Sequence, residues 1–351
     1  MKVSLMFFAG RAAPIDQGSP LYQLLLDAAA LADEAGMTAV WTPERHFSQF
    51  GGTFPNPSVV SAAVAVTTKR LRIRAGSVIS PLHDPLRIAE EWAVVDNLSN
   101  GRVELSFGSG WNTNDFVLAP DRYEDRREAM RRDIDTVKAL WSGQPVTRRN
   151  GSGQEIEVRT LPCPVQAELP IWLTAQSDAT FDSAARSGLP VLTNLNFNSP
   201  DTLARRCAAY RQAADSTGQN GRTSVALMLP TYLAPTDAAA RRQSAEPLRD
   251  YLRQNLNLRA DFAAGKRPAT QASPPTPDEI EQIVEAGVRR VQDWAGLIGA
   301  PPTVAARLDA FEAQGIDEIA CLVDFGTDHQ STMASLGLLA ELATSSSAPT
   351  N

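Results

Sequence analysis

The sequence predicts a (β/α)8 barrel, the α/β fold in which eight parallel strands alternate with surrounding helices. Eight short apolar runs recur along the chain, amphipathic stretches separate them, and glycine repeatedly stands between a predicted helix and the next run. Most of these runs are continuously apolar, which is typical of parallel strands covered on both faces. No G-x-G-x-x-G motif follows the first run, so a dinucleotide-binding fold is not favoured.

The eight apolar runs give the predicted strands in chain order. They are Val3–Phe8, Ala39–Trp41, Leu71–Ile79, Val103–Phe107, Ile171–Thr174, Val191–Leu195, Val225–Leu229 and Glu318–Val323. Five intervening helices are expected to begin at a cap residue followed by proline, because the cap side chain satisfies a free backbone N–H and proline needs none. These pairs are Ser19-Pro20, Asn56-Pro57, Asp84-Pro85, Ser199-Pro200 and Thr276-Pro277. Three helices are expected to end at Gly36, Gly188 and Gly315, since glycine readily adopts the left-handed conformation that follows a helix.

The length of 351 residues exceeds the roughly 250 that a barrel needs. We therefore expect one domain over residues 1–343, with insertions near 142–168 and 234–302, and a disordered low-complexity tail over 344–351. In the first insertion, Asn150–Gly153 predicts a hairpin turn. In the second, the proline-rich segment Gly265–Pro277 predicts a break between helices and a flap over the site.

Composition excludes several classes of protein. No apolar run is long enough for a membrane helix, and the first residues do not resemble a signal peptide, so a cytoplasmic protein is expected. The net charge of −7 argues against binding nucleic acid or an anionic membrane. The three cysteines, Cys163, Cys207 and Cys321, have neither disulfide-framework nor zinc-site spacing. A small-molecule or protein-bound substrate is favoured.

Polar side chains follow several predicted strands, where a barrel places its active site. His46 and Glu44 follow the second strand, and His46 is positioned as a general base or a substrate hydrogen-bond donor. His83 is expected to hold its loop, and His329 to be solvated. No histidine pair has metal-ligand spacing, so no metal is predicted. The rim lacks a reactive group of its own, which favours an organic cofactor.

Two of these loops are suited to a phosphate. Gly108-Ser109-Gly110 after the fourth strand allows close backbone approach, and Ser177 with Thr180 opens the helix after the fifth strand, where free N–H groups favour an anion. The alternative is that Ser177 only caps its helix and the glycines only form a turn.

Several longer segments resemble the bacterial luciferase-like flavin-dependent monooxygenases, and within them the branch associated with natural-product assembly lines. The segments are Trp41–Phe47 (WTPERHF), Phe54–Ser58 (FPNPS), Pro85–Trp92 (PLRIAEEW), Asp96–Arg102 (DNLSNGR), Asn114–Pro120 (NDFVLAP) and Gly315–Gly326 (GIDEIACLVDFG). The resemblance extends over about residues 1–340.

The resemblance implies a (β/α)8 barrel that binds reduced FMN supplied by a separate flavin reductase, reacts with O2, and forms a homodimer. It implies an acyl, aminoacyl or other small-molecule substrate, free or tethered to a carrier protein. A minority branch of the family uses a deazaflavin for hydride transfer, which is the first alternative. A non-catalytic flavin-binding partner subunit is the second.

By the same resemblance, Ala75, Gly76 and Ser77 contact the flavin ring, where the family often has a non-proline cis peptide. The residues expected to hold the phosphate are Ser109, Gly110, Gln176, Ser177 and Thr180. Glu44 and His46 occupy the loop of the acid–base groups. The apolar barrel mouth is expected to exclude water and to include Phe7, Phe8, Trp111 and Phe116.

The chain departs from this branch at Asn112 and Asn194, where histidines are usual. Asparagine can hydrogen-bond but cannot carry a proton near neutral pH. We therefore expect Asn112 and Asn194, with Asp324, to align the substrate, and His46 to be the one titrating imidazole beside the flavin. The loop Ala175–Thr180 also looks one residue shorter than usual in this branch.

Overall fold

The computed structural model describes residues 1–8, 19–48, 50–195, 198–219, 223–264 and 276–346. Its strands are β1 (Lys2–Met6), β2 (Ala39–Thr42), β3 (Arg72–Ile79), β4 (Val103–Gly108), β5 (Val146–Arg149), β6 (Glu155–Val158), β7 (Ile171–Thr174), β8 (Val191–Asn194), β9 (Val225–Leu233), β10 (Leu297–Gly299) and β11 (Glu318–Leu322). Eight of them coincide with the eight predicted strands, with ends that differ by a few residues.

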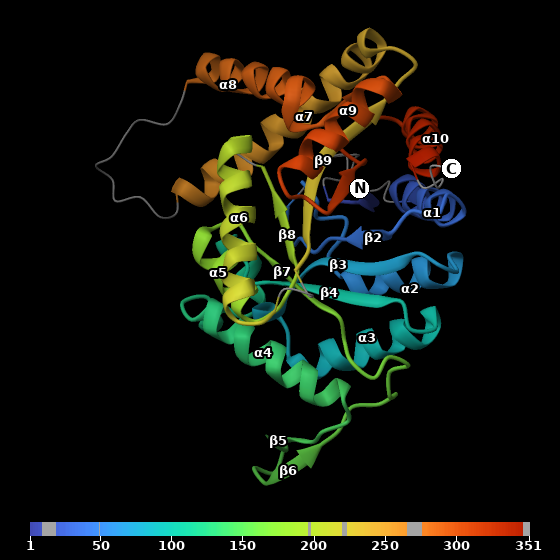
Figure 1. Cartoon of the computed structure of the whole chain (residues 1–351). Coiled ribbons are helices and arrows are strands. Elements are labelled where there is room, and N and C mark those ends of the chain that lie inside the picture. The colour runs from blue at the N-terminus through green and yellow to red at the C-terminus, as the bar shows by residue number, and fades with distance from the viewer. Residues whose placement is uncertain (9–18, 49, 196–197, 220–222, 265–275, 347–351) are drawn as a thin grey trace.

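Those eight strands close into a parallel barrel (Figure 1). The order is β1-β2-β3-β4-β7-β8-β9-β11, and β11 returns to β1 in the register Leu5 to Cys321. Closure on the other side comes from β8 and β9, which pair Val191 with Val225. The predicted (β/α)8 barrel is therefore confirmed.

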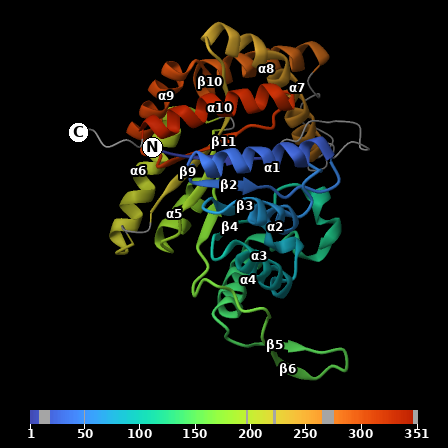
Figure 2. The same cartoon turned by 90° about the vertical axis from the view of Figure 1, so that its right-hand side faces the viewer.

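Helices follow the barrel strands and cover the outside of the sheet. They are α1 (Ser19–Glu34), α2 (Pro57–Thr67), α3 (Pro85–Ser99), α4 (Arg126–Trp141), α5 (Asp178–Arg186), α6 (Pro200–Ser216), α7 (Asp237–Ala264), α8 (Pro277–Arg290), α9 (Pro301–Ala313) and α10 (His329–Ser346). Figure 2 shows α10 lying beside α1, where the last helix meets the first. Within the described ranges, no helix is long and apolar enough to cross a membrane.

Four of the five expected caps and the three expected helix-ending glycines are present in the structure, whereas α1 includes Ser19 as its first residue. The Asn56 side chain accepts the backbone N–H groups of Ser58 and Val59, and Thr276 forms a capping box with Glu279. Gly36, Gly188 and Gly315 have φ values of 71°, 62° and 89°, the left-handed conformation that ends each helix before a strand.

The two predicted insertions lie at opposite ends of the barrel. The β5–β6 hairpin, which turns at Asn150–Gly153 as predicted, precedes β7 and so belongs to the N-terminal end of the strands. Helices α7 and α8 follow β9 and so belong to the C-terminal end, where the active site of such a barrel lies. Of the predicted flap, residues 265–275 lie outside the described residues.

The predicted start of the tail was wrong, because α10 continues to Ser346 and so includes Thr344. The hydroxyl of Thr344 donates to the carbonyls of Ala340 and Glu341 one turn earlier, so this polar side chain is satisfied within the helix. Residues 347–351 lie outside the described residues.

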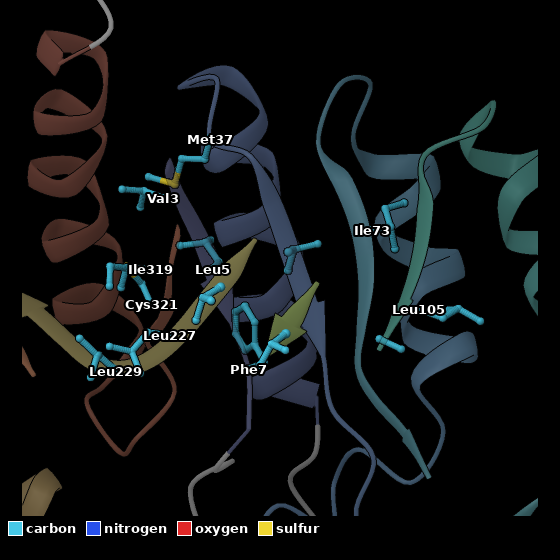
Figure 3. Packing of buried hydrophobic residues seen from close by; sticks show 14 of the residues in the cluster. Val3, Leu5, Phe7, Met37, Ile73, Leu105, Leu227, Leu229, Ile319 and Cys321 are labelled. Carbon is cyan, nitrogen blue, oxygen red and sulfur yellow. The ribbon is translucent and has the colours of Figure 1, made fainter. Parts of the chain in front are cut away.

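Alternation along the strands divides the buried residues into two layers. Val3, Leu5 and Phe7 face outward from β1 into the core between sheet and helices, as Figure 3 shows. Met6 faces the barrel interior with Trp41 and other side chains. Phe7 was predicted to line the barrel mouth. That prediction was wrong, because its ring packs edge-on against Phe54 in the outer core, with 6.4 Å between the ring centroids.

The barrel interior contains an ionic network around Arg74. The guanidinium lies between the rings of Trp41 and Trp172, at 4.7 and 4.6 Å from their centroids. Its Nε donates to Glu104 at 2.6 Å, and its Nη1 donates to both carboxylate oxygens of Glu318, at 2.7 and 2.9 Å. The charges of Arg72 and Arg74 are thus balanced inside the barrel by those of Glu104 and Glu318.

Candidate active site

The loops after β2 and β3 bring three titratable side chains together at the C-terminal rim. Glu44 Oε1 accepts Nε2 of His46 at 3.0 Å and Nε2 of His83 at 2.5 Å. Glu44 Oε2 accepts the backbone N–H of Ile79 at 2.7 Å. The Glu44 side chain is fully buried, and those of His46 and His83 are 8% and 28% exposed. The structure therefore joins the predicted pair and adds His83 to it.

This arrangement fixes the charge on Glu44. Burial by itself would raise the pKa of Glu44, but the hydrogen bonds from His46 and His83, the charge of His83 and the N–H of Ile79 together lower it. Burial opposes the charged form of His83 as well, yet the hydrogen bond and the charge of Glu44, with Glu91 and Asp133, raise the pKa of His83. The sequence-based expectation of a single imidazole here was wrong, because the His83 ring lies beside that of His46 on the same carboxylate.

The same three groups have the composition of a metal site, with ligand atoms within 4.8 Å of one another. Two ligands at about 2.1 Å from a zinc ion are separated by roughly 3.0–3.4 Å. Glu44 Oε1 and His83 Nε2 lie 2.5 Å apart, closer than that separation. Both imidazoles thus lie within hydrogen-bond distance of Glu44 Oε1.

The residues predicted to contact a flavin ring lie on β3. The Gly76–Ser77 peptide is cis, as the resemblance implied. Ser77 Oγ hydrogen-bonds Thr174 Oγ1 of β7, which also lies 2.8 Å from Ser106 Oγ of β4. Ala75 instead packs into the outer core, so only its backbone can border the interior. Three neighbouring strand ends thus present a continuous row of hydroxyl groups.

Two glycines shape the surface beside these hydroxyl groups. A Cβ atom on Gly76 would lie 3.1 Å from the Met6 methyl and 3.2 Å from Trp41, so a side chain there would have to displace one of these neighbours. Gly110 has φ +73°, and a Cβ on it would come within 2.8 Å of both Ile79 and Phe116. The loop after β4 therefore requires glycine for its shape, which is the turn interpretation of this motif.

The helix N-terminus predicted to bind a phosphate lies directly after β7. Ser177 caps α5, and its Oγ lies 3.3 Å from Thr180 N and 3.0 Å from Thr180 Oγ1. Gln176 and Ser177 are exposed. Asp178, the first residue of the helix, pairs with Arg206 of α6 at 2.6 Å, which offsets its charge beside the helix N-terminus. Because β4 and β7 are neighbours, this end of α5 adjoins the Gly108–Gly110 loop.

The two asparagines differ in what their side chains do. Asn112 is buried and used by its own loop: Nδ2 donates to Asp115 at 2.8 Å and Oδ1 accepts the backbone N–H of Asn114. Asn194 lies at the end of β8, and within the described structure its buried Oδ1 accepts no hydrogen bond. Asp324 accepts the backbone N–H of Phe8 at 3.0 Å, which fastens the end of β1 to that of β11.

Further residues that the sequence did not single out lie nearby. The guanidinium of Arg45 stands 5.3 Å from the ring centroids of both Phe8 and Trp111. Asp115 is buried beside it, and burial raises the pKa of Asp115 although the charges of Arg45 and His46 oppose this. Tyr251 of α7 contacts Phe50, and Phe50 in turn contacts Phe8. The long insertion therefore covers an aromatic, cationic mouth.

Comparisons with known proteins agree with these observations. Residues 1–318 match the family described as luciferase-like monooxygenase. The oxygenase component of the flavin-dependent trigonelline monooxygenase of Acinetobacter baylyi is 25% identical over 342 residues, 96% of this chain and 92% of that protein. The F420-dependent glucose-6-phosphate dehydrogenase of Amycolatopsis mediterranei is 29% identical over 191 residues, 52% of this chain and 56% of that protein.

Solved structures give the same fold. The monooxygenase RslO1 of Streptomyces bottropensis has a TM-score of 0.79 and 24% identity, covering 99% of this chain and 100% of that one. The FMN complex of the oxygenating constituent of 3,6-diketocamphane monooxygenase of Pseudomonas putida has a TM-score of 0.74 and 21% identity, covering 98% of both chains.

Proposed function

This chain belongs to the luciferase-like monooxygenase family, and we propose that, as a flavin-dependent monooxygenase, it is the oxygenase component of a two-component system that uses reduced FMN and O2. The reduced FMN would come from a separate flavin reductase. The name of the Acinetobacter relative, an oxygenase component, supports this partnership. Bound reduced FMN supplies the two electrons needed to activate oxygen.

The observation that carries the proposal is the row of hydroxyl groups near the C-terminal ends of β3, β4 and β7, formed by Ser77, Ser106 and Thr174. Gly76, which is buried against Met6 and Trp41, adds no side chain to this surface, and Ser77 and Thr174 offer hydroxyl groups that a flavin ring would contact. The surface leads to the N-terminus of α5 at Ser177, where N–H groups and the helix dipole favour a phosphate. The buried Oδ1 of Asn194 is an acceptor that a ring N–H would satisfy.

In this proposal His46 handles protons. Because Glu44 is ionised, it only accepts hydrogen bonds, so His46 Nε2 carries a hydrogen and Nδ1 is left to take or release a proton. Glu44 fixes this tautomer and orients the ring. Phe8, Trp111 and Phe116 exclude water from the mouth.

We further propose an acyl or aminoacyl substrate, free or tethered to a carrier protein. Arg45, held between Phe8 and Trp111, provides a cation for a carboxylate or an acyl oxygen. Aromatic rings on both sides suit the apolar remainder of such a molecule.

A deazaflavin-dependent oxidoreductase is the second candidate, and the similarity to the F420-dependent dehydrogenase favours it. Anaerobic titration separates the two cofactors. We expect reduced FMN to bind at least tenfold more tightly than reduced riboflavin, which lacks the phosphate, and more tightly than reduced F420. Ser177→Ala should reduce the difference in affinity between reduced FMN and reduced riboflavin, because it removes a hydroxyl from the proposed phosphate site. Tighter binding of F420 would instead select the deazaflavin alternative.

We also propose that the protein is a homodimer that joins through α2 and α3. Val59 and Val66 of α2 are 65% and 68% exposed, and Val94 and Leu98 of the adjacent α3 are 45% and 48% exposed. Four large apolar side chains on neighbouring helices form the kind of patch that marks an interface. A second copy would present the same patch, which suits a two-fold contact.

The double variant Val66→Asp with Val94→Asp is expected to convert a dimer to a monomer, because two carboxylates would be buried in the contact. Light scattering coupled to size-exclusion chromatography measures the change. Ile283→Asp, which alters a side chain of α8 that is 46% exposed, is the matched control and should remain dimeric. A wild-type protein that is monomeric at micromolar concentration would contradict the proposal.

A further inference from the structure

The imidazoles of His46 and His83 meet at one oxygen atom. Glu44 Oε1 lies 3.0 Å from His46 Nε2 and 2.5 Å from His83 Nε2. The second oxygen, Oε2, is occupied by the N–H of Ile79. Two imidazoles from two loops therefore share a single anionic acceptor, and that acceptor is fully buried.

We propose that His83 is a positioning residue that sets the basicity of His46, because the two imidazoles compete for the charge of Glu44. When His83 is charged, it neutralises the carboxylate and a second charge on His46 has no counter-ion left. When the charge on His83 is removed, the whole charge of Glu44 acts on His46 and holds its proton more strongly. The acid–base role of His46 belongs to the proposed function, and this inference rests on it.

The surroundings favour a positive charge on His83. Glu44, Glu91 and Asp133 face it from the loop after β2, from α3 and from α4, and together they raise the pKa of His83 against the effect of burial. Arg122 donates to the carbonyl of His83 at 2.7 Å and pairs with Asp133, so it fixes the loop.

His46 lies among different charges. Besides Glu44, the groups near it are Arg45 of the same loop and Asp115 of the loop after β4. Its side chain is 8% exposed, against 28% for His83. His83 can therefore exchange protons with solvent more readily than His46, which suits a residue that adjusts the site rather than one that performs the chemistry.

The chain has three histidines, so each imidazole can be followed by NMR of protein labelled with 15N histidine. The test variant is His83→Gln, whose amide can still donate to Glu44 Oε1 but carries no charge. The control is His329→Gln, because His329 of α10 pairs with Asp27 at 3.1 Å and is 41% exposed. Neither flavin nor oxygen is needed.

In His83→Gln we expect the titration of His46 to move to higher pH by about one pH unit, a tenfold stronger proton affinity. His329→Gln should leave that titration in place. The reciprocal variant His46→Gln should move the titration of His83 upward, and it tests the coupling if His83→Gln does not fold. An unchanged or lowered midpoint of the remaining imidazole in a folded variant would overturn the proposal.

Turnover gives a separate readout. The acidic limb of the pH profile of kcat should move upward in His83→Gln by the same amount, with the KM for reduced FMN unchanged. If the imidazole titration moves and the kcat profile does not, the coupling stands and the acid–base role of His46 in the proposed function is refuted. The two failures are therefore distinguishable.

Discussion

Replacing His46 with glutamine is expected to lower turnover at least a hundredfold, while the affinity for reduced FMN stays within about threefold. General acid–base catalysis by a positioned side chain contributes about 10²–10⁴-fold. Glutamine can keep the hydrogen bond to Glu44 Oε1, which His46 makes at 3.0 Å, but it cannot take up a proton. Formation of product containing one atom from 18O2, measured by mass spectrometry on a substrate found by screening, gives the rate.

His329→Gln is the matched control, since this histidine makes an exposed contact of 3.1 Å with Asp27 between α10 and α1. It should retain wild-type turnover. A His46→Gln variant with full turnover would contradict the assigned role. Conversely, loss of turnover with unchanged flavin binding would exclude a non-catalytic partner subunit, the second alternative for this chain.

Arg74→Met is expected to destabilise the fold by about 3–5 kcal/mol, the cost of removing one partner from a buried ion pair. Glu318 would then lose its contacts of 2.7 and 2.9 Å to the guanidinium. Among the described residues, Glu104 would keep its contacts with Arg72 and with the indole of Trp172. Equilibrium unfolding in urea measures the loss, and adding Glu318→Gln to Arg74→Met should recover part of it, because an uncompensated charge is removed.

Arg87→Met is the control for this prediction. Arg87 is 65% exposed and pairs with Glu90 and Glu91 on the same helix, so its removal should change the free energy of unfolding by less than about 0.5 kcal/mol. Equal effects of the two variants would contradict the assignment of Arg74 as a stabilising centre of the barrel interior.

The interior network also predicts a direction for the pH dependence. Burial would raise the pKa of Glu104, but the charges of Arg74 and Arg72 lower it below its usual value of about 4.5. The stability that Glu104 contributes is therefore present above that value and is lost as the pH falls through the lowered pKa.

Most of the fold could be predicted because local patterns determine it. Apolar runs, cap-proline pairs and helix-ending glycines repeat along the chain, and each acts within a few residues. What could not be predicted depends on distant partners. Strand β9 continues to Leu233 because Thr231–Leu233 pairs with β10, and the three residues of β10 have no pattern of their own to announce them.

The site was predicted in part for the same reason. Glu44 and His46 follow a strand directly, which places them at the rim. His83 was interpreted as a loop residue, because its role depends on a contact across two loops to Glu44 Oε1. The outward position of Ala75 follows from the alternation of side chains along a strand, because Arg74 and Gly76 on either side of it face the interior.

The reaction of bound reduced FMN with oxygen is the most direct measurement. Protein saturated with reduced FMN under anaerobic conditions is mixed with O2 in a stopped-flow spectrophotometer. We expect one flavin per chain to pass through a transient absorbing species that differs from both reduced and oxidised FMN and decays more slowly than free reduced FMN is oxidised. Absence of binding, or oxidation with the spectrum and rate of free flavin both with and without candidate substrates, would contradict the assignment of this chain as an FMN-dependent monooxygenase.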